Sequence, residues 1–106
     1  MRRAELLYLS AIVAGELLFG FRNGSRYERN RDTFRTFLAN PYVEFLAVTQ
    51  TTADRFARIA SGLRRKGTPI PANDMWIAAH ALEVGADLVS FDRHFDIVEG
   101  LVLAEL

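Results

Sequence analysis

The chain has 106 residues, half of them hydrophobic, a formal net charge of zero and no cysteine. This length suits a single domain, residues 1–106, and the hydrophobic content argues against disorder. The lack of cysteine excludes a disulfide, a thiol nucleophile and a cysteine-bound metal, and it fits a reducing compartment, so we expect a cytoplasmic protein. We expect neither a membrane span nor a signal peptide, because the apolar runs are short and Glu5 interrupts the first of them.

Charge is unevenly distributed along the chain. Residues 22–66 hold ten Lys and Arg against four Asp and Glu, whereas residues 67–106 hold one against seven. A basic surface beside an acidic, metal-binding cleft suits a polyanion, because guanidinium groups contact phosphates. The ordinary alternative is a solvated helix face, in which Arg26, Arg29 and Arg35 only keep one helix soluble.

The first half of the chain predicts two strands with two helices between them. Residues 6–10 indicate a strand, and Ser10 is the expected cap of a helix over residues 11–21. An Asn-Gly-Ser turn separates this helix from a second one over residues 26–39, which an Asn-Pro pair closes. Residues 43–48 indicate the next strand.

A longer amphipathic helix is expected in the middle of the chain. Thr51 with Asp54 three positions later predicts an Asp version of a capping box at its start. Apolar residues then recur at helical spacing over residues 53–63. Gly67 is the expected end of this helix.

The last third of the chain predicts one more helix and two short strands. The helix carries Asp74, follows a stiff loop with two prolines, and is expected to end at Gly85. Residues 88–89 and 101–103 indicate strands. The alternation of strands and helices favours an α/β fold with a parallel sheet covered by helices.

Three acids interrupt segments that otherwise read as buried. Glu16 shares a helix face with apolar residues three or four positions away, and Asp74 shares one with Ile77 and Ala78. Asp92 follows a short apolar run that reads as a buried strand, and α/β sheets bind ligands at strand ends. Carboxylates buried together need a compensating cation, and a divalent metal is the simplest one.

Each acid also has an ordinary interpretation, which the sequence leaves open. Glu16 can pair with an arginine, Asp74 can cap its helix or favour its first turn, and Asp92 can serve a turn. If the three meet, the expected ion is Mg²⁺ or Mn²⁺, because these hard cations prefer carboxylate and water oxygens. Asp96, four residues after Asp92, is the alternative third ligand.

Other polar residues near these acids are candidates for supporting roles. Ser10 and Ser90 can hydrogen-bond a phosphate or a metal-bound water, and Asn73 can orient Asp74, although each is as easily a local cap or turn residue.

The two histidines, His80 and His94, do not form a zinc motif, and we interpret them as surface or hydrogen-bonding residues. Trp76 can stack on an RNA base, but packing in the core or in a dimer interface is the favoured interpretation.

The segments around the three acids resemble those of the PIN-domain ribonucleases, and specifically of the toxins of VapBC-type toxin–antitoxin modules. These segments are SAIVAGEL (residues 10–17), IPANDMWIAAHA (70–81) and SFDRHF (90–95), in the family's order and spacing. The resemblance covers nearly the whole chain and implies a three-layer α/β/α fold with a central parallel sheet. It also implies a Mg²⁺- or Mn²⁺-dependent endoribonuclease that cuts RNA, usually as a homodimer blocked by a VapB-like antitoxin.

The resemblance places the catalytic and metal-binding site at Glu16, Asp74 and Asp92. One part of the family pattern has no counterpart here, the opening strand that ends in Asp-Thr-Asn and supplies a further ligand. We therefore expect an N-terminally truncated PIN-like fold, whose unpaired sheet edges allow strand exchange between subunits. Two hypotheses follow: a toxin that hydrolyses RNA, and, as the alternative, a catalytically impaired module that dimerises or binds the antitoxin without cleaving RNA.

Overall fold

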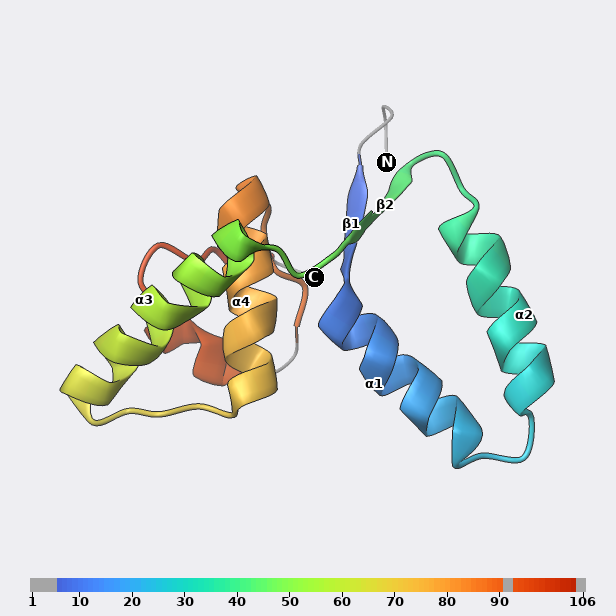
Figure 1. Ribbon diagram of the computed structural model, residues 1–106, viewed down its shortest axis with the longest axis horizontal. Coiled ribbons are helices and arrows are strands. Elements are labelled where there is room, and N and C mark those ends of the chain that lie inside the picture. Colours follow the sequence, from blue (N-terminus) through green and yellow to red (C-terminus); the bar gives the residue numbers. More distant parts are fainter. Residues whose placement is uncertain (1–5, 91–92, 105–106) are drawn as a thin grey trace. The chain divides into compact units, whose positions relative to one another are not determined.

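The computed structural model describes residues 6–90 and 93–104. Contacts divide the chain into two compact units, Met1–Ala47 and Val48–Leu106. Figure 1 shows α1 and α2 with their strands in the first unit, and α3 with α4 in the second. The expectation of a single domain stays a prediction, and each unit is described by itself.

The first unit follows the element order expected from the sequence. Its elements are β1 (Leu7–Ser10), α1 (Ala11–Arg22), α2 (Tyr27–Leu38) and β2 (Val43–Leu46). The predicted cap of α1 is confirmed, because Oγ of Ser10 accepts a hydrogen bond of 3.1 Å from the backbone N–H of Ile12. A polar side chain at this position satisfies one of the free N–H groups of the first helical turn.

β1 and β2 pair as a two-stranded parallel sheet. Leu7 lies opposite Val43, and Ser10 lies opposite Leu46. Parallel neighbours cannot be joined by a tight turn, so the chain needs a crossover. Here α1 leads away from the sheet and α2 returns to it, as Figure 1 shows.

Aromatic contacts join α1 to α2. The rings of Phe21 and Phe34 meet edge to face with centroids 6.3 Å apart. At the turn between the helices, the guanidinium of Arg22 lies 4.2 Å from the ring centroid of Tyr27 and donates a hydrogen bond of 2.9 Å to its hydroxyl. These contacts fix the helix pair through packing and a cation–π interaction.

The second unit contains α3 (Gln50–Lys66), α4 (Ala72–Val84) and the short 3₁₀ helix η1 (Arg93–Ile97). The predicted capping box of Thr51 and Asp54 is wrong by two residues. Thr49 caps α3 instead, and its reciprocal partner is Thr52.

Two glycines end the helices of the second unit where the sequence predicted. Gly67 follows α3 with φ of 71°, and Gly85 follows α4 with φ of 67°. Both angles are left-handed, which glycine adopts without steric cost. The two strands expected after Gly85 are reduced, within the described residues, to one parallel bridge between Leu88 and Leu103.

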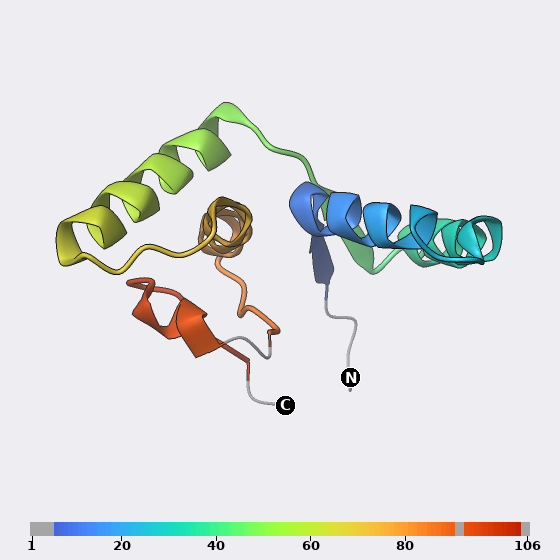
Figure 2. The same ribbon diagram turned by 90° about the horizontal axis from the view of Figure 1, so that it is seen from below.

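The core of the second unit lies between α3, α4 and η1. Figure 2 looks almost along α4 and shows α3 and η1 on different sides of it. The buried cluster consists of Ile59, Leu63, Ile70, Ala78, Ala79, Phe95 and Val98. Ala78 and Ala79 are fully buried, which lets the backbone of α4 approach its neighbours closely.

Trp76 belongs to this packing. Its ring stacks on that of Phe56 with centroids 4.0 Å apart and an interplanar angle of 19°. The contact joins α4 to α3, and it confirms the packing interpretation of Trp76. His80 is also internal, with 2% of its surface exposed, which leaves hydrogen bonding, and not a surface position, as the interpretation of this histidine.

None of the described helices is long and apolar enough to cross a membrane.

Candidate functional site

Asp74 occupies the third helical position of α4, in the first turn after the N-cap residue Pro71. In a capping box, an acid at this position bonds the backbone N–H of the N-cap residue. Pro71 has no N–H, so this role is closed to Asp74, and no side chain caps α4. The negative charge still favours the positive end of the helix dipole. The carboxylate is therefore available for a contact outside its own helix.

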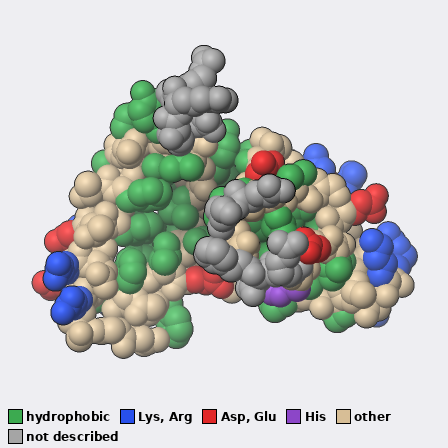
Figure 3. Space-filling view, turned by 180° about the vertical axis from the view of Figure 1, so that it is seen from behind, with side chains coloured by type: hydrophobic (Ala, Val, Ile, Leu, Met, Phe, Trp, Pro, Cys, Tyr) green, Lys and Arg blue, Asp and Glu red, His purple; other side chains and the backbone are tan. Residues whose placement is uncertain are grey.

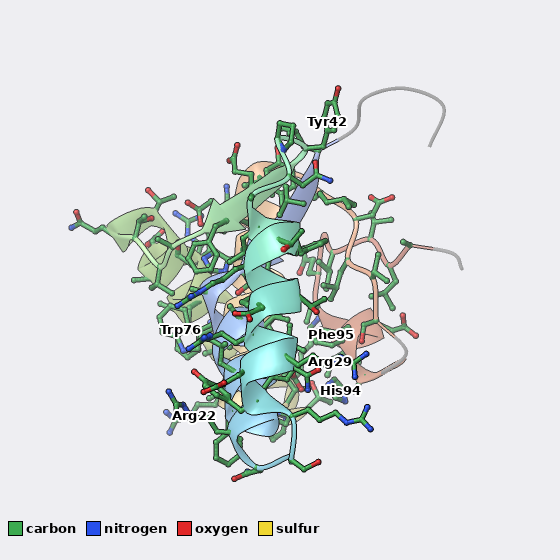
Figure 4. All side chains as sticks on the ribbon, turned by 90° about the vertical axis from the view of Figure 1, so that its right-hand side faces the viewer. Arg22, Arg29, Tyr42, Trp76, His94 and Phe95 are labelled. Atoms are coloured by element: carbon green, nitrogen blue, oxygen red, sulfur yellow. The ribbon has the colours of Figure 1, made fainter. Side chains whose placement is uncertain are left out.

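That contact is with His94. Nε2 of His94 lies 2.8 Å from Oδ2 of Asp74, although the two residues are 20 positions apart. The side chains are 36% and 20% exposed, respectively, so water and ions reach the pair. The imidazole also lies beside the ring of Phe95, with centroids 4.9 Å apart (both residues are labelled in Figure 4). The hydrogen-bonding interpretation of His94 is thus confirmed.

Glu16 lies in α1 of the first unit and is exposed. The expectation that it shares a buried face is wrong, since Phe19 on that face is 70% exposed. The physical reason is that α1 is apolar around most of its circumference, whereas its neighbours cover only part of it. Ala14 is the residue of α1 that is buried.

The third predicted ligand, Asp92, lies outside the described residues. Its alternative, Asp96, is exposed on η1. Among the supporting candidates, Ser10 is the cap of α1, Asn73 is exposed in the first turn of α4, and Ser90 is half-buried. For Ser10 the local interpretation is confirmed.

The predicted metal ligands come from both units, and the metal site stays a prediction. Within the described residues of either unit, no group of three His, Asp or Glu side chains is placed to hold a metal ion. Asp74 itself fits such an ion, because its carboxylate oxygens are hard donors and its side chain is 20% exposed. Protein-bound Mg²⁺ keeps several waters and often has only one or two carboxylate ligands.

A basic surface lies on α3 of the second unit. Figure 3 shows Lys and Arg side chains gathered over this helix. A hollow of about 270 Å³ opens beside it, with Arg58, Arg65 and Lys66 around an apolar floor that includes Ile59 and Leu63. Arg58 also pairs with Asp54, Nε to Oδ2 at 3.0 Å, but both side chains are largely exposed. The basic residues expected within 22–66 therefore lie in both units, because Arg29 and Arg35 are exposed on α2.

The first unit exposes large hydrophobic side chains, and Figure 3 shows hydrophobic groups spread over its visible face. The exposed large hydrophobic residues of this unit are Leu6, Leu7, Tyr8, Leu17, Phe19, Phe37, Tyr42 and Phe45. A patch this extensive marks an interaction surface more often than a solvated one.

The chain belongs to the PIN domain family, whose sequence profile matches residues 1–101. It is 31% identical over 86 residues to ribonuclease VapC1 of Haemophilus influenzae, which covers 81% of this chain and 63% of that protein. It is also 31% identical over 94 residues to the tRNA(fMet)-specific endonuclease VapC of Salmonella typhimurium, with coverage of 88% and 70%. The predicted resemblance to PIN-domain proteins named VapC is confirmed, and the chain spans less than two thirds of the VapC1 length.

The fold agrees with solved relatives. The structure of VapBC-1 from nontypeable Haemophilus influenzae superposes on this chain with a TM-score of 0.87 at 25% identity. This superposition covers 99% of the present chain and 78% of the other. The α/β PIN-like fold with parallel strands is therefore confirmed.

Proposed function

We propose that this protein is a metal-dependent endoribonuclease and the toxin of a type II toxin–antitoxin system, acting in the cytoplasm. The observation that carries the proposal is the PIN-family match over residues 1–101, because the similar VapC proteins of two bacteria are named as a ribonuclease and an endonuclease. The absence of cysteine supports the cytoplasmic location.

We assign the metal ligands to Glu16, Asp74 and Asp92, with Mg²⁺ or Mn²⁺ as the ion. When bound, such an ion activates a water molecule as the nucleophile and neutralises charge on the phosphoryl oxygens. The chain contributes carboxylate oxygens, and Asp74 is the ligand whose surroundings are best defined. Its negative charge sits at the positive end of α4, and His94 bonds one of its two oxygens.

The basic surface of α3 is the proposed contact for the RNA backbone. It carries Arg55, Arg58, Arg64, Arg65 and Lys66, all of them exposed. Arginine and lysine at a surface position bind phosphates without reading the base sequence. We assign the exposed arginines of α2 to keeping that helix soluble, which is the alternative role given above for Arg29 and Arg35.

The proposed protein partners are a VapB-like antitoxin and a second copy of the chain. The VapBC-1 structure of the Haemophilus relative supports the antitoxin. The exposed hydrophobic side chains of the first unit supply the surface that either partner needs, and the short β1–β2 sheet has edges open to strand exchange within the described residues.

A catalytically impaired module is the second candidate function. Such a module binds its partner protein but leaves RNA intact at any Mn²⁺ concentration.

A cleavage assay separates the two candidates. Metal-free protein is incubated with a mixed RNA pool, with and without added Mn²⁺, as wild type, Asp74→Asn and Asp54→Asn. The nuclease proposal predicts Mn²⁺-dependent cleavage that Asp74→Asn abolishes. Asp54→Asn is the matched control, because it removes an exposed acid of α3 that is not among the proposed ligands. Intact RNA with the wild type at high Mn²⁺ supports the impaired module instead.

A further inference from the structure

We propose that His94 is a positioning residue for the metal site, which fixes the Asp74 carboxylate through a hydrogen bond from Nε2–H to Oδ2. The inference rests on the proposed function, because it concerns Asp74 as a metal ligand. His94 has no assigned role in that proposal beyond its contact with Asp74.

The geometry of the pair defines which atom donates. The separation of 2.8 Å between Nε2 and Oδ2 is typical of a charge-assisted hydrogen bond. An ionised carboxylate only accepts hydrogen bonds, so the hydrogen lies on Nε2 of His94. With Oδ2 engaged in this way, Oδ1 of Asp74 is the oxygen that a metal ion takes.

His94 is held in place by the core rather than by a loose loop. Its neighbour Phe95 is 3% exposed, and Val98 is 4% exposed. Both side chains pack in the buried cluster with residues of α3 and α4. The imidazole is therefore presented to the start of α4 by a short helix, and Phe95 and Val98, which follow His94 in the chain, are packed in the core. This anchoring limits the conformational freedom of His94.

Asp74 needs such a partner because its own helix does not hold it. The N-cap Pro71 offers no N–H to an acid at the third position, as noted above. A carboxylate free to rotate loses rotamer entropy when it binds a metal. Hydrogen-bonded partners of metal ligands remove this cost and typically contribute 10–100-fold in affinity, by the order of magnitude seen in metal sites.

The ordinary alternative is that the pair only ties η1 to α4. This alternative predicts that loss of His94 lowers thermal stability and leaves the metal affinity of the folded protein unchanged. The positioning role predicts that metal affinity falls and that a side chain with a donor near the position of Nε2 restores it.

The test is a calorimetric titration of the full chain with Mn²⁺, accompanied by thermal unfolding without metal. The variants are His94→Leu and His94→Asn, which lose the contact, and His94→Gln, whose side-chain amide reaches toward the position of Nε2. Asp54→Asn is the control. We expect the first two to weaken Mn²⁺ binding roughly 10-fold or more, His94→Gln to recover most of it, and the control to match wild type.

The outcomes separate this inference from the proposed function. Wild-type affinity in both folded His94→Leu and His94→Asn overturns the positioning role while leaving the metal site intact. Equal weakening in all three His94 variants also overturns it, because the donor is then irrelevant. Failure of the wild type to bind Mn²⁺ overturns the proposed metal site and this inference together.

Discussion

The hydroxyl of Thr52 donates a hydrogen bond of 2.6 Å to Oε1 of Glu83, and so joins the start of α3 to the end of α4. Thr52 is fully buried and also completes the capping box with Thr49. One side chain therefore satisfies a helix terminus and a contact between two helices that run in opposite directions (Figure 1). This arrangement makes Thr52 a sensitive position for the stability of the second unit.

Thr52→Val is expected to lower the free energy of unfolding by about 2 kcal/mol, because it removes, at nearly constant volume, the acceptor of the Thr49 backbone N–H and the hydroxyl bonded to Glu83. Thr52→Ser keeps the hydroxyl and is the control. Urea denaturation followed by circular dichroism measures both changes. Equal stability of the Val variant and the wild type contradicts the assigned role.

The stacking of the Phe56 ring on the Trp76 ring is expected to stabilise the contact between α3 and α4. A double-mutant cycle with Phe56→Leu and Trp76→Leu, measured by urea denaturation, is predicted to give a coupling energy of about 1 kcal/mol. If Trp76 instead stacks on RNA, Trp76→Leu weakens RNA binding while the coupling energy is near zero.

Arg65→Gln combined with Lys66→Gln is expected to weaken RNA binding and its dependence on salt. Each charge contacts a phosphate in the proposed complex, so the slope of log affinity against log salt falls by about 1.4 for two contacts on a single strand. Fluorescence anisotropy with labelled RNA, in metal-free buffer, measures this slope.

The matched control removes two exposed arginines of α2, as Arg29→Gln with Arg35→Gln. These are predicted to leave the slope unchanged, because α2 is assigned to solubility. A loss of slope in the α2 pair but not in the α3 pair contradicts the placement of the RNA surface.

Phe19→Ser is expected to weaken self-association without unfolding the chain. Phe19 is 70% exposed, so its replacement changes the free energy of unfolding by no more than about 0.5 kcal/mol. Removal of a large apolar side chain from a dimer interface shifts the equilibrium toward monomer. Sedimentation equilibrium measures the shift, and an unchanged dimer fraction excludes Phe19 from the interface.

Local signals in the sequence predicted the element boundaries well. Ser10 before an apolar run, and Gly67 and Gly85 after the helical periodicity ends, each act through neighbouring backbone groups. The start of α3 was misjudged because a tertiary contact decides it. Burial of Thr52 against Glu83 selects the box that begins at Thr49, and that contact spans 31 positions.

The candidate site could be predicted only in part from the sequence, because contacts between distant residues also shape it. Helical periodicity identifies a buried face when one side of a helix is apolar, and α1 is apolar nearly all round, so the pattern misplaced Glu16. The partnership of Asp74 with His94 joins residues from different elements, and no spacing rule contains it. The one sequence signal for this contact is Pro71 at the N-cap of α4, because Pro71 has no N–H for Asp74 to accept in a capping box.

The most direct test of the central claim is a calorimetric titration of Mn²⁺ into the wild-type chain and into Asp74→Asn. The claim predicts saturable binding by the wild type and its loss in Asp74→Asn, with both proteins showing the same circular dichroism spectrum. Equal binding by the two proteins, or none by the wild type, contradicts the assignment of Asp74 as a metal ligand.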